Sequence, residues 1–112
     1  MTAENVKAIS EGSTVSYEWT EGGFSGNFYE VTLLPEGKLT WRGLEGSEAG
    51  QSATEDQVVV REVAPGVTQV AWLESVGYTV NLIIVTGEGR VFGLVTSGTE
   101  FYPHAGKLRE VR

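Results

Sequence analysis

Cysteine is absent from the sequence, and histidine occurs once, at His104. Without cysteine the chain has no disulfide framework, no thiolate metal site and no cysteine nucleophile, which suits a reducing cytoplasm. One imidazole is fewer than the two or three that zinc and non-haem iron sites usually use. We therefore expect a cytoplasmic protein with no metal site, whose one histidine is an ordinary surface residue of a loop.

Basic clusters and long apolar runs are also missing. The formal net charge is −7 at pH 7, and the lysines and arginines are scattered along the chain. Because such a chain repels phosphate groups, we expect neither a nucleic acid nor an anionic membrane as a partner. No apolar run approaches the ~18 residues that a membrane helix needs, and the N-terminus lacks the basic and apolar segments of a signal peptide.

Helix-forming segments are scarce, and short strands dominate the pattern. The helical candidate is the stretch 3–9, within an N-terminal arm or lid of residues 1–11. The 15 glycines fall mostly between β-branched and aromatic runs, which is typical of short strands joined by tight turns. Period-two alternation and turn signals predict strands at residues 14–20, 27–34, 38–42, 50–53, 57–63, 68–74, 77–85, 90–96 and 107–111.

These strands predict one all-β domain over residues 1–112. Connections of hairpin length favour a small antiparallel up-and-down β-barrel with little helix over a sandwich. Several strands are apolar on both faces, as in VTQVAWLE and YTVNLIIV. A small barrel fills its interior with one such face and can cover the other face with a partner subunit.

The hairpin around Ser75–Val76 carries the first candidate for chemistry. A two-residue loop there would pair Val70 with Asn81, and period-two geometry places Val70, Trp72 and Glu74 on one face. If this face lines the interior, desolvation raises the pKa of the Glu74 carboxyl and lets it exchange a proton near neutral pH. The alternative is that Glu74 lies in water at the rim of the barrel.

The opposite face of the same hairpin is also apolar. The two-residue loop assigns to it Ala71, Leu73, Val80 and Leu82. Because an exposed apolar face of this kind needs cover, we expect a homodimer.

Aromatic residues near the start of the barrel are candidates for ligand contacts. Tyr17 and Trp19 share one face of the first strand, where a phenol can hydrogen-bond a ligand and an indole can form a flat apolar wall. The alternative is that both are ordinary core aromatics. Trp41 and Arg42 end the third strand, and Arg42 either clamps a carboxylate or lies outside the barrel.

With its strands placed, the chain resembles the phenolic acid decarboxylases and the related MoaF-like proteins, which share a lipocalin-like barrel. The resemblance covers roughly residues 12–93 and is carried by an ordered series of segments. They are YEW at 17–19, YEV at 29–31, WR at 41–42, AGQ at 49–51, GVTQVAWLE at 66–74, the strand at 77–82 and EGRVFGLV at 88–95.

The resemblance implies site residues as well as a fold. In those decarboxylases two tyrosines and an arginine hold a hydroxycinnamic acid, a glutamate handles the proton, and carbon dioxide leaves without a cofactor. By position, Tyr17 matches the first tyrosine and Glu74 matches the glutamate. Trp19 and Gln51 stand where the second tyrosine and the arginine would be, so the charge-assisted anchor for a carboxylate, typically ~1.5–3 kcal/mol, is lost.

Three hypotheses follow. The first is a MoaF-like barrel that binds a small organic, aromatic or phenolic ligand without a cofactor, through Trp19, Trp41, Gln51, Trp72 and Asn81. The second is a cofactor-free lyase or isomerase in which Glu74 is the acid/base and Tyr17 positions the substrate. The third is a structural or interaction protein whose barrel is packed shut.

Overall fold

Nine β-strands make up most of the chain in the computed structural model, which describes residues 8–112. Two 3-10 turns, η2 (Pro35–Gly37) and η3 (Thr86–Glu88), are the helical elements of this part of the chain. The strands are β1 (Thr14–Glu21), β2 (Phe28–Leu34), β3 (Lys38–Glu45), β4 (Ser52–Glu55), β5 (Val58–Ala64), β6 (Val67–Leu73), β7 (Thr79–Val85), β8 (Arg90–Ser97) and β9 (Glu100–Val111).

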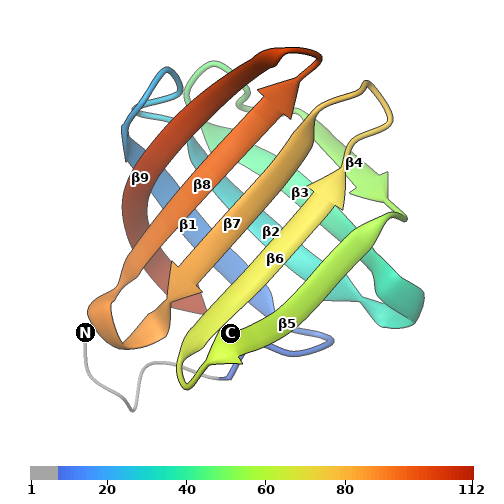
Figure 1. Cartoon of the computed structure of the whole chain (residues 1–112), viewed down its shortest axis with the longest axis vertical. Coiled ribbons are helices and arrows are strands. Elements are labelled where there is room, and N and C mark those ends of the chain that lie inside the picture. Colours follow the sequence, from blue (N-terminus) through green and yellow to red (C-terminus); the bar gives the residue numbers. More distant parts are fainter. Residues whose placement is uncertain (1–7) are drawn as a thin grey trace.

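The strands form one antiparallel sheet that curls into a nearly closed barrel (Figure 1). Its order is β4-β3-β2-β1-β9-β8-β7-β6-β5, so consecutive strands pair with one another except β4 and β5, and β1 also pairs with β9. The two edge strands are β4 and β5, which follow one another along the chain. This arrangement confirms the predicted all-β up-and-down barrel.

The main difference in strand boundaries is at β9, which begins at Glu100 rather than Lys107. Proline lacks the N–H that donates to a β-ladder, so Pro103 is unfavourable in a strand that has neighbours on both sides. Pro103 pairs with Leu94 of β8, whereas β1 pairs with β9 only from Ala105 onward. The proline therefore lies where β9 has one neighbour instead of two. The predicted helix at 3–9 falls largely outside the described residues.

The predicted register of the β6–β7 hairpin is wrong by one residue. Trp72 pairs with Val80, and Val70 pairs with Leu82. The loop has three residues and closes with Gly77 in the left-handed region at φ 102°, which a glycine adopts without steric cost. The shift of one residue exchanges the two faces of β7.

Inward-facing apolar side chains fill one half of the barrel. They alternate along each strand with outward polar positions, as period two requires. This packed half contains most of the buried apolar residues of the described part of the chain: Val15, Val31, Leu33, Leu39, Val70, Leu82, Ile84, Val91, Leu108 and Val111. They belong to the half that is closed by the turns at 35–37, 65–66 and 86–89.

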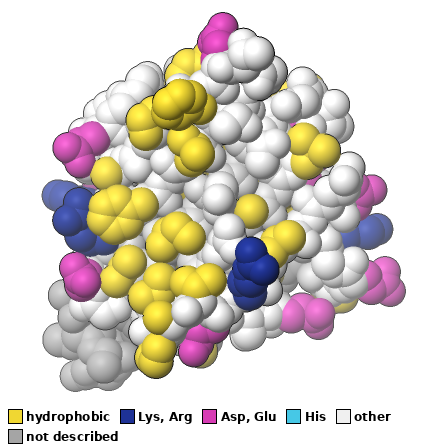
Figure 2. All heavy atoms as spheres, viewed as in Figure 1, with side chains coloured by type: hydrophobic (Ala, Val, Ile, Leu, Met, Phe, Trp, Pro, Cys, Tyr) yellow, Lys and Arg dark blue, Asp and Glu magenta, His cyan; other side chains and the backbone are white. Residues whose placement is uncertain are grey.

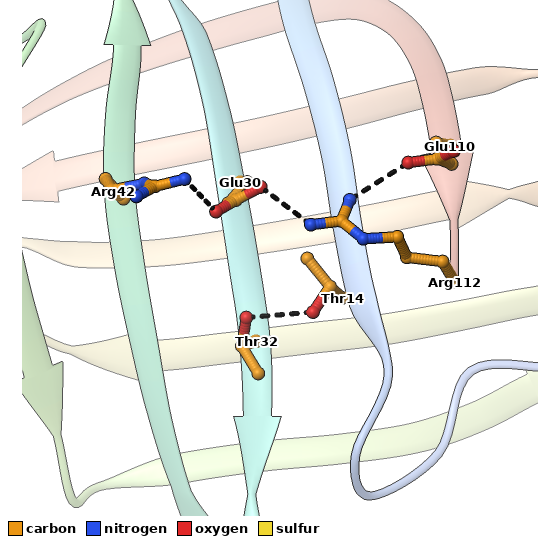
Figure 3. Close-up of polar contacts among 6 residues, drawn as sticks. All are labelled: Thr14, Glu30, Thr32, Arg42, Glu110 and Arg112. Carbon is orange, nitrogen blue, oxygen red and sulfur yellow. Dashed lines mark hydrogen bonds and ion pairs between the residues drawn. The ribbon is translucent and has the colours of Figure 1, made fainter.

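Two outer faces of the barrel differ in character. The outer face of β1, β2 and β3 is polar: the Glu30 carboxylate forms ion pairs with both Arg42 and Arg112, as Figure 3 shows. Thr14 and Thr32 share a hydrogen bond of 3.0 Å on the same face. Arg42 therefore lies outside the barrel, which settles the choice left open by the sequence.

The outer face of β6, β7 and β8 is apolar instead. Its exposed side chains include Leu73, Phe92 and Leu94, and Phe101 of β9 lies beside them. Figure 2 shows hydrophobic side chains gathered over this face, with charged groups mostly around its rim. We call it the outer apolar face. The hairpin shift moves Val80 and Leu82 off this face and into the interior, so the composition predicted for it is corrected.

Candidate functional site

A cavity of about 700 Å³ occupies the half of the barrel opposite the packed core. This volume lies within the range of small-molecule sites, roughly 300–1,000 Å³. Its walls are mainly aromatic: all three tryptophans of the chain and three of its four tyrosines line it. The lining comprises Tyr17, Trp19, Phe24, Tyr29, Trp41, Ser47, Glu48, Gly50, Gln51, Ser52, Ala53, Trp72, Glu74, Val76, Tyr78, Val80 and Val95. A barrel packed shut, the third hypothesis, does not fit this interior.

Glu74 lies at the cavity wall at the end of β6. The indole Nε1 of Trp72 donates to its Oε2 at 3.0 Å. Burial raises the pKa of the Glu74 carboxyl, and the nearby Glu55 and Glu48 carboxylates raise it further, while the bond from Trp72 opposes the shift. Of the two positions that the sequence left open for Glu74, the structure has the inward one at the cavity wall, where the carboxyl is partly desolvated.

Glu55 is a second carboxylate at this end of the barrel, and it is buried. Its Oε2 accepts from the indole Nε1 of Trp41 at 3.1 Å, and its Oε1 accepts from the backbone N–H of Ser75 at 3.2 Å. The side chain thus joins β3, β4 and the β6–β7 loop. It orients the Trp41 indole, which is half-buried and lines the cavity.

The β3–β4 loop brings a third carboxylate, Glu48, to the cavity. The buried Tyr29 hydroxyl donates to Glu48 Oε1 at 2.5 Å, and Asn27 binds both the Tyr29 hydroxyl and Ser47. The loop also folds back on β3, where a Cβ on Gly43 would lie 2.1 Å from the Glu48 carbonyl oxygen. Only glycine allows this approach, so the loop position depends on the sequence at Gly43 as well as on Tyr29.

The Tyr17 hydroxyl faces the cavity without a hydrogen-bond partner among the described residues. The side chain is 3% exposed and lines the cavity. Every fully buried polar side-chain atom in residues 8–112 has a hydrogen-bond partner. Because the Tyr17 hydroxyl has none, its oxygen is not fully buried and is accessible from the cavity. Burial raises the pKa of Tyr17 well above its usual range, and the phenol stays protonated at neutral pH. It can donate to, or accept from, a polar group of a ligand.

His104 is buried behind the cavity wall, not exposed in a loop as predicted. Its Nε2 accepts from the backbone N–H of Phe24 at 3.1 Å, and its Nδ1 lies 2.9 Å from the Tyr102 carbonyl oxygen. The neutral tautomer with a proton on Nδ1 satisfies both contacts. Burial also lowers the pKa of His104, so this group brings no positive charge to the site.

The structure gathers most of the residues expected at the site. Tyr17, Trp19, Trp41, Gln51, Trp72 and Glu74 all line the cavity, with Gln51 at its exposed mouth. Asn81 does not: it lies on the outer face, where its Oδ1 accepts from Gln69 at 3.0 Å. The hairpin shift explains this correction, because the predicted register placed Asn81 opposite Val70 and the observed register places it opposite Ala71.

Sequence reasoning missed four prominent lining residues, Phe24, Tyr29, Glu48 and Tyr78. Tyr29 could have been found, since it continues the inward period of Val31 and Leu33 along β2. Tyr78 follows from the corrected hairpin. Phe24 and Glu48 lie in glycine-rich loops, where no periodicity indicates which way a side chain points.

A model of the MoaF-like family matches residues 11–109. The chain belongs to the MoaF-like family. The match covers β1 to β8, β9 as far as residue 109, and every residue that lines the cavity, so the resemblance in the sequence is confirmed at the level of the family.

Other comparisons with this MoaF-like chain show the fold alone. No curated protein matches it. Among solved structures, a "putative beta-lactamase" from Burkholderia vietnamiensis is similar, with a TM-score of 0.77 and 20% sequence identity over 93% of this chain and 97% of that chain. At this identity the likeness shows a shared barrel.

Residues 8–112 bring no three carboxylate or histidine side chains together in an arrangement that could hold a metal ion. Over the same described range, none of the helical segments has the length and apolar character of a bilayer-spanning helix. The side chains that line the cavity offer stacking on indoles and phenols, hydrogen bonding to the Tyr17 hydroxyl, and proton exchange or charge pairing at Glu74.

Proposed function

We propose that this MoaF-like barrel binds a small organic molecule with an aromatic ring, such as a phenol, in its cavity. The observation that carries the proposal is the combination of a cavity of about 700 Å³ with walls of three tryptophans and three tyrosines. Flat aromatic walls favour stacked or edge-to-face contact with a ring. The open Tyr17 hydroxyl supplies one polar contact that fixes the ring's orientation.

Ligand-observed NMR with planar phenols tests this proposal. We expect saturation transfer to at least one phenol at millimolar concentration, and loss of transfer in Trp72→Ala, which removes a buried wall. Asn81→Ala is the matched control, because that side chain lies on the outer face. An absence of binding, or binding that Trp72→Ala leaves unchanged, would overturn the proposal.

A second candidate is a cofactor-free lyase or isomerase, favoured by the raised pKa of Glu74. In a decarboxylation the bond to the carboxyl carbon breaks, carbon dioxide leaves, and a proton from Glu74 completes the product. Tyr17 would position the substrate from β1. This activity is tested by incubating the protein with hydroxycinnamic acids and measuring the loss of absorbance and the release of carbon dioxide. Equal rates in wild type and Glu74→Gln would refute the role assigned to Glu74.

We also propose that a second copy of this chain covers the outer apolar face. Among the outward positions of β6, β7 and β8, only Arg90 is charged, and its guanidinium stacks on Phe92 at 4.8 Å from the ring centroid. An isologous contact would bring these uncharged surfaces together away from the acidic rim.

A further inference from the structure

The charges at the cavity are all of one sign. Glu48 and Glu74 line it, and Glu55 lies buried beside them, close enough for both neighbours to raise the pKa of Glu74. No lysine, arginine or histidine is among the lining residues of the described chain.

The arginines are held on the outside of the barrel. Arg42 and Arg112 pair with Glu30, Arg109 pairs with Glu18, and Arg61 binds Gln69. Arg90 stacks on the outward Phe92. Within residues 8–112, the carboxylates at the cavity therefore receive hydrogen bonds from indoles, a phenol and a backbone N–H, but no positive charge.

The remaining walls suit a positive charge. The faces of indole and phenol rings carry negative electrostatic potential, and cages of such rings bind ammonium groups. The Tyr17 oxygen, which is buried, has no partner among the described residues and is open to the cavity, can accept a hydrogen bond from an ammonium group. The same surroundings oppose a carboxylate ligand, which would be desolvated next to Glu48 and Glu74 with no basic residue to pair with it.

We propose that the cavity selects a small organic cation: a protonated amine joined to a compact ring or apolar body. This inference rests on the proposed function, since it names the charge of the ligand that the aromatic cavity binds. The ammonium group would lie between the Glu74 and Glu48 carboxylates and the Tyr17 hydroxyl. The ring would lie against the tryptophans.

Three probes of matched shape test the proposal: 3-phenylpropylamine, 3-phenylpropan-1-ol and 3-phenylpropanoate. Calorimetric titrations near neutral pH measure the affinity of each probe. We expect the amine to bind at least about tenfold more tightly than the alcohol, and the carboxylate to bind most weakly. Glu74→Gln, which keeps an acceptor for Trp72, should weaken binding of the amine by about tenfold and weaken binding of the alcohol much less. Glu36→Gln, in the exposed turn at the other end of the barrel, is the matched control.

Two failures are distinguishable. If none of the three probes binds, the proposed function itself is wrong. If the alcohol binds and the amine is no tighter, or the carboxylate is the tightest, the cavity binds rings but the cation inference is wrong. An equal loss of amine and alcohol binding in Glu74→Gln would also contradict it, since that result indicates a structural role for Glu74.

Discussion

Replacing Tyr29 by phenylalanine removes the bond that holds the β3–β4 loop over the cavity. The hydroxyl is buried and donates to the Glu48 carboxylate at 2.5 Å. Hydrogen bonds to charged groups contribute about 1.5–3 kcal/mol. Asn27 keeps Ser47 as a partner, and the half-buried Glu48 can turn to water, so we expect the lower part of this range, about 1.5–2 kcal/mol. Such a loss lowers Tm by roughly 6–12 °C.

A double-mutant cycle with Glu48→Ala isolates the bond. Urea unfolding followed by tryptophan fluorescence gives the free energy of unfolding of each variant, and we expect a coupling energy of about 1 kcal/mol between the two positions. Amide exchange at Gly50 and Gln51 should also speed up in Tyr29→Phe, because the loop loses its anchor. A loss below about 0.5 kcal/mol, or additive effects in the cycle, would refute the view that this bond holds the loop.

Three further predictions concern the site and the outer face. The pKa of Glu74 is raised in the folded state, so the free energy of unfolding falls as pH rises from the usual carboxyl pKa through the raised one. Urea titrations at acid and neutral pH should show that Glu74→Gln removes this part of the pH dependence, and an unchanged profile would contradict the prediction. Gly43→Ala forces its Cβ against the Glu48 carbonyl and should cost about 1–3 kcal/mol in unfolding free energy, whereas Gly87→Ala, with open space around it, should be nearly neutral. Light scattering should find a dimer that Leu94→Glu, on the outer apolar face, converts to a monomer, and a wild-type monomer would end the dimer proposal.

Amine binding should also depend on pH. A protonated amine keeps its charge below about pH 10, so its affinity should fall as pH drops through the raised pKa of Glu74. Glu48, Glu55, Tyr17 and Tyr29 are the other ionisable side chains that lie near this carboxyl. The two tyrosines stay protonated across this range because burial raises the pKa of each well above its usual value. The neutral alcohol should show no such dependence.

The barrel could be predicted from sequence because its signals are local. Alternation of apolar and polar residues fixes the inward face of each strand, and glycine-rich turns separate the strands. These signals place Tyr17, Trp19 and Trp72 inside correctly. The same period, continued one residue past β6, allows the inward direction of Glu74, but the sequence left it open because a residue at the end of a strand often faces water.

The errors arose where one residue decides the geometry. Counting two loop residues instead of three moved Asn81 inside and Val80 outside, because a shift of one position reverses every side chain of a strand. Glu48 could not be placed, since its position depends on a bond to Tyr29, 19 residues away, and on the close approach at Gly43. The burial of His104 depends on the extension of β9 through Pro103, against the local preference of proline.

The indole N–H signals of the three tryptophans offer the most direct measurement of ligand binding, because all three side chains line the cavity. In ¹H–¹⁵N spectra recorded during a titration with 3-phenylpropylamine, we expect the three indole signals to shift along one common binding curve. Backbone amides around Phe92 and Leu94 on the outer apolar face should stay in place. Indole signals that do not move, or shifts confined to that outer face, would show that the aromatic cavity is not the binding site.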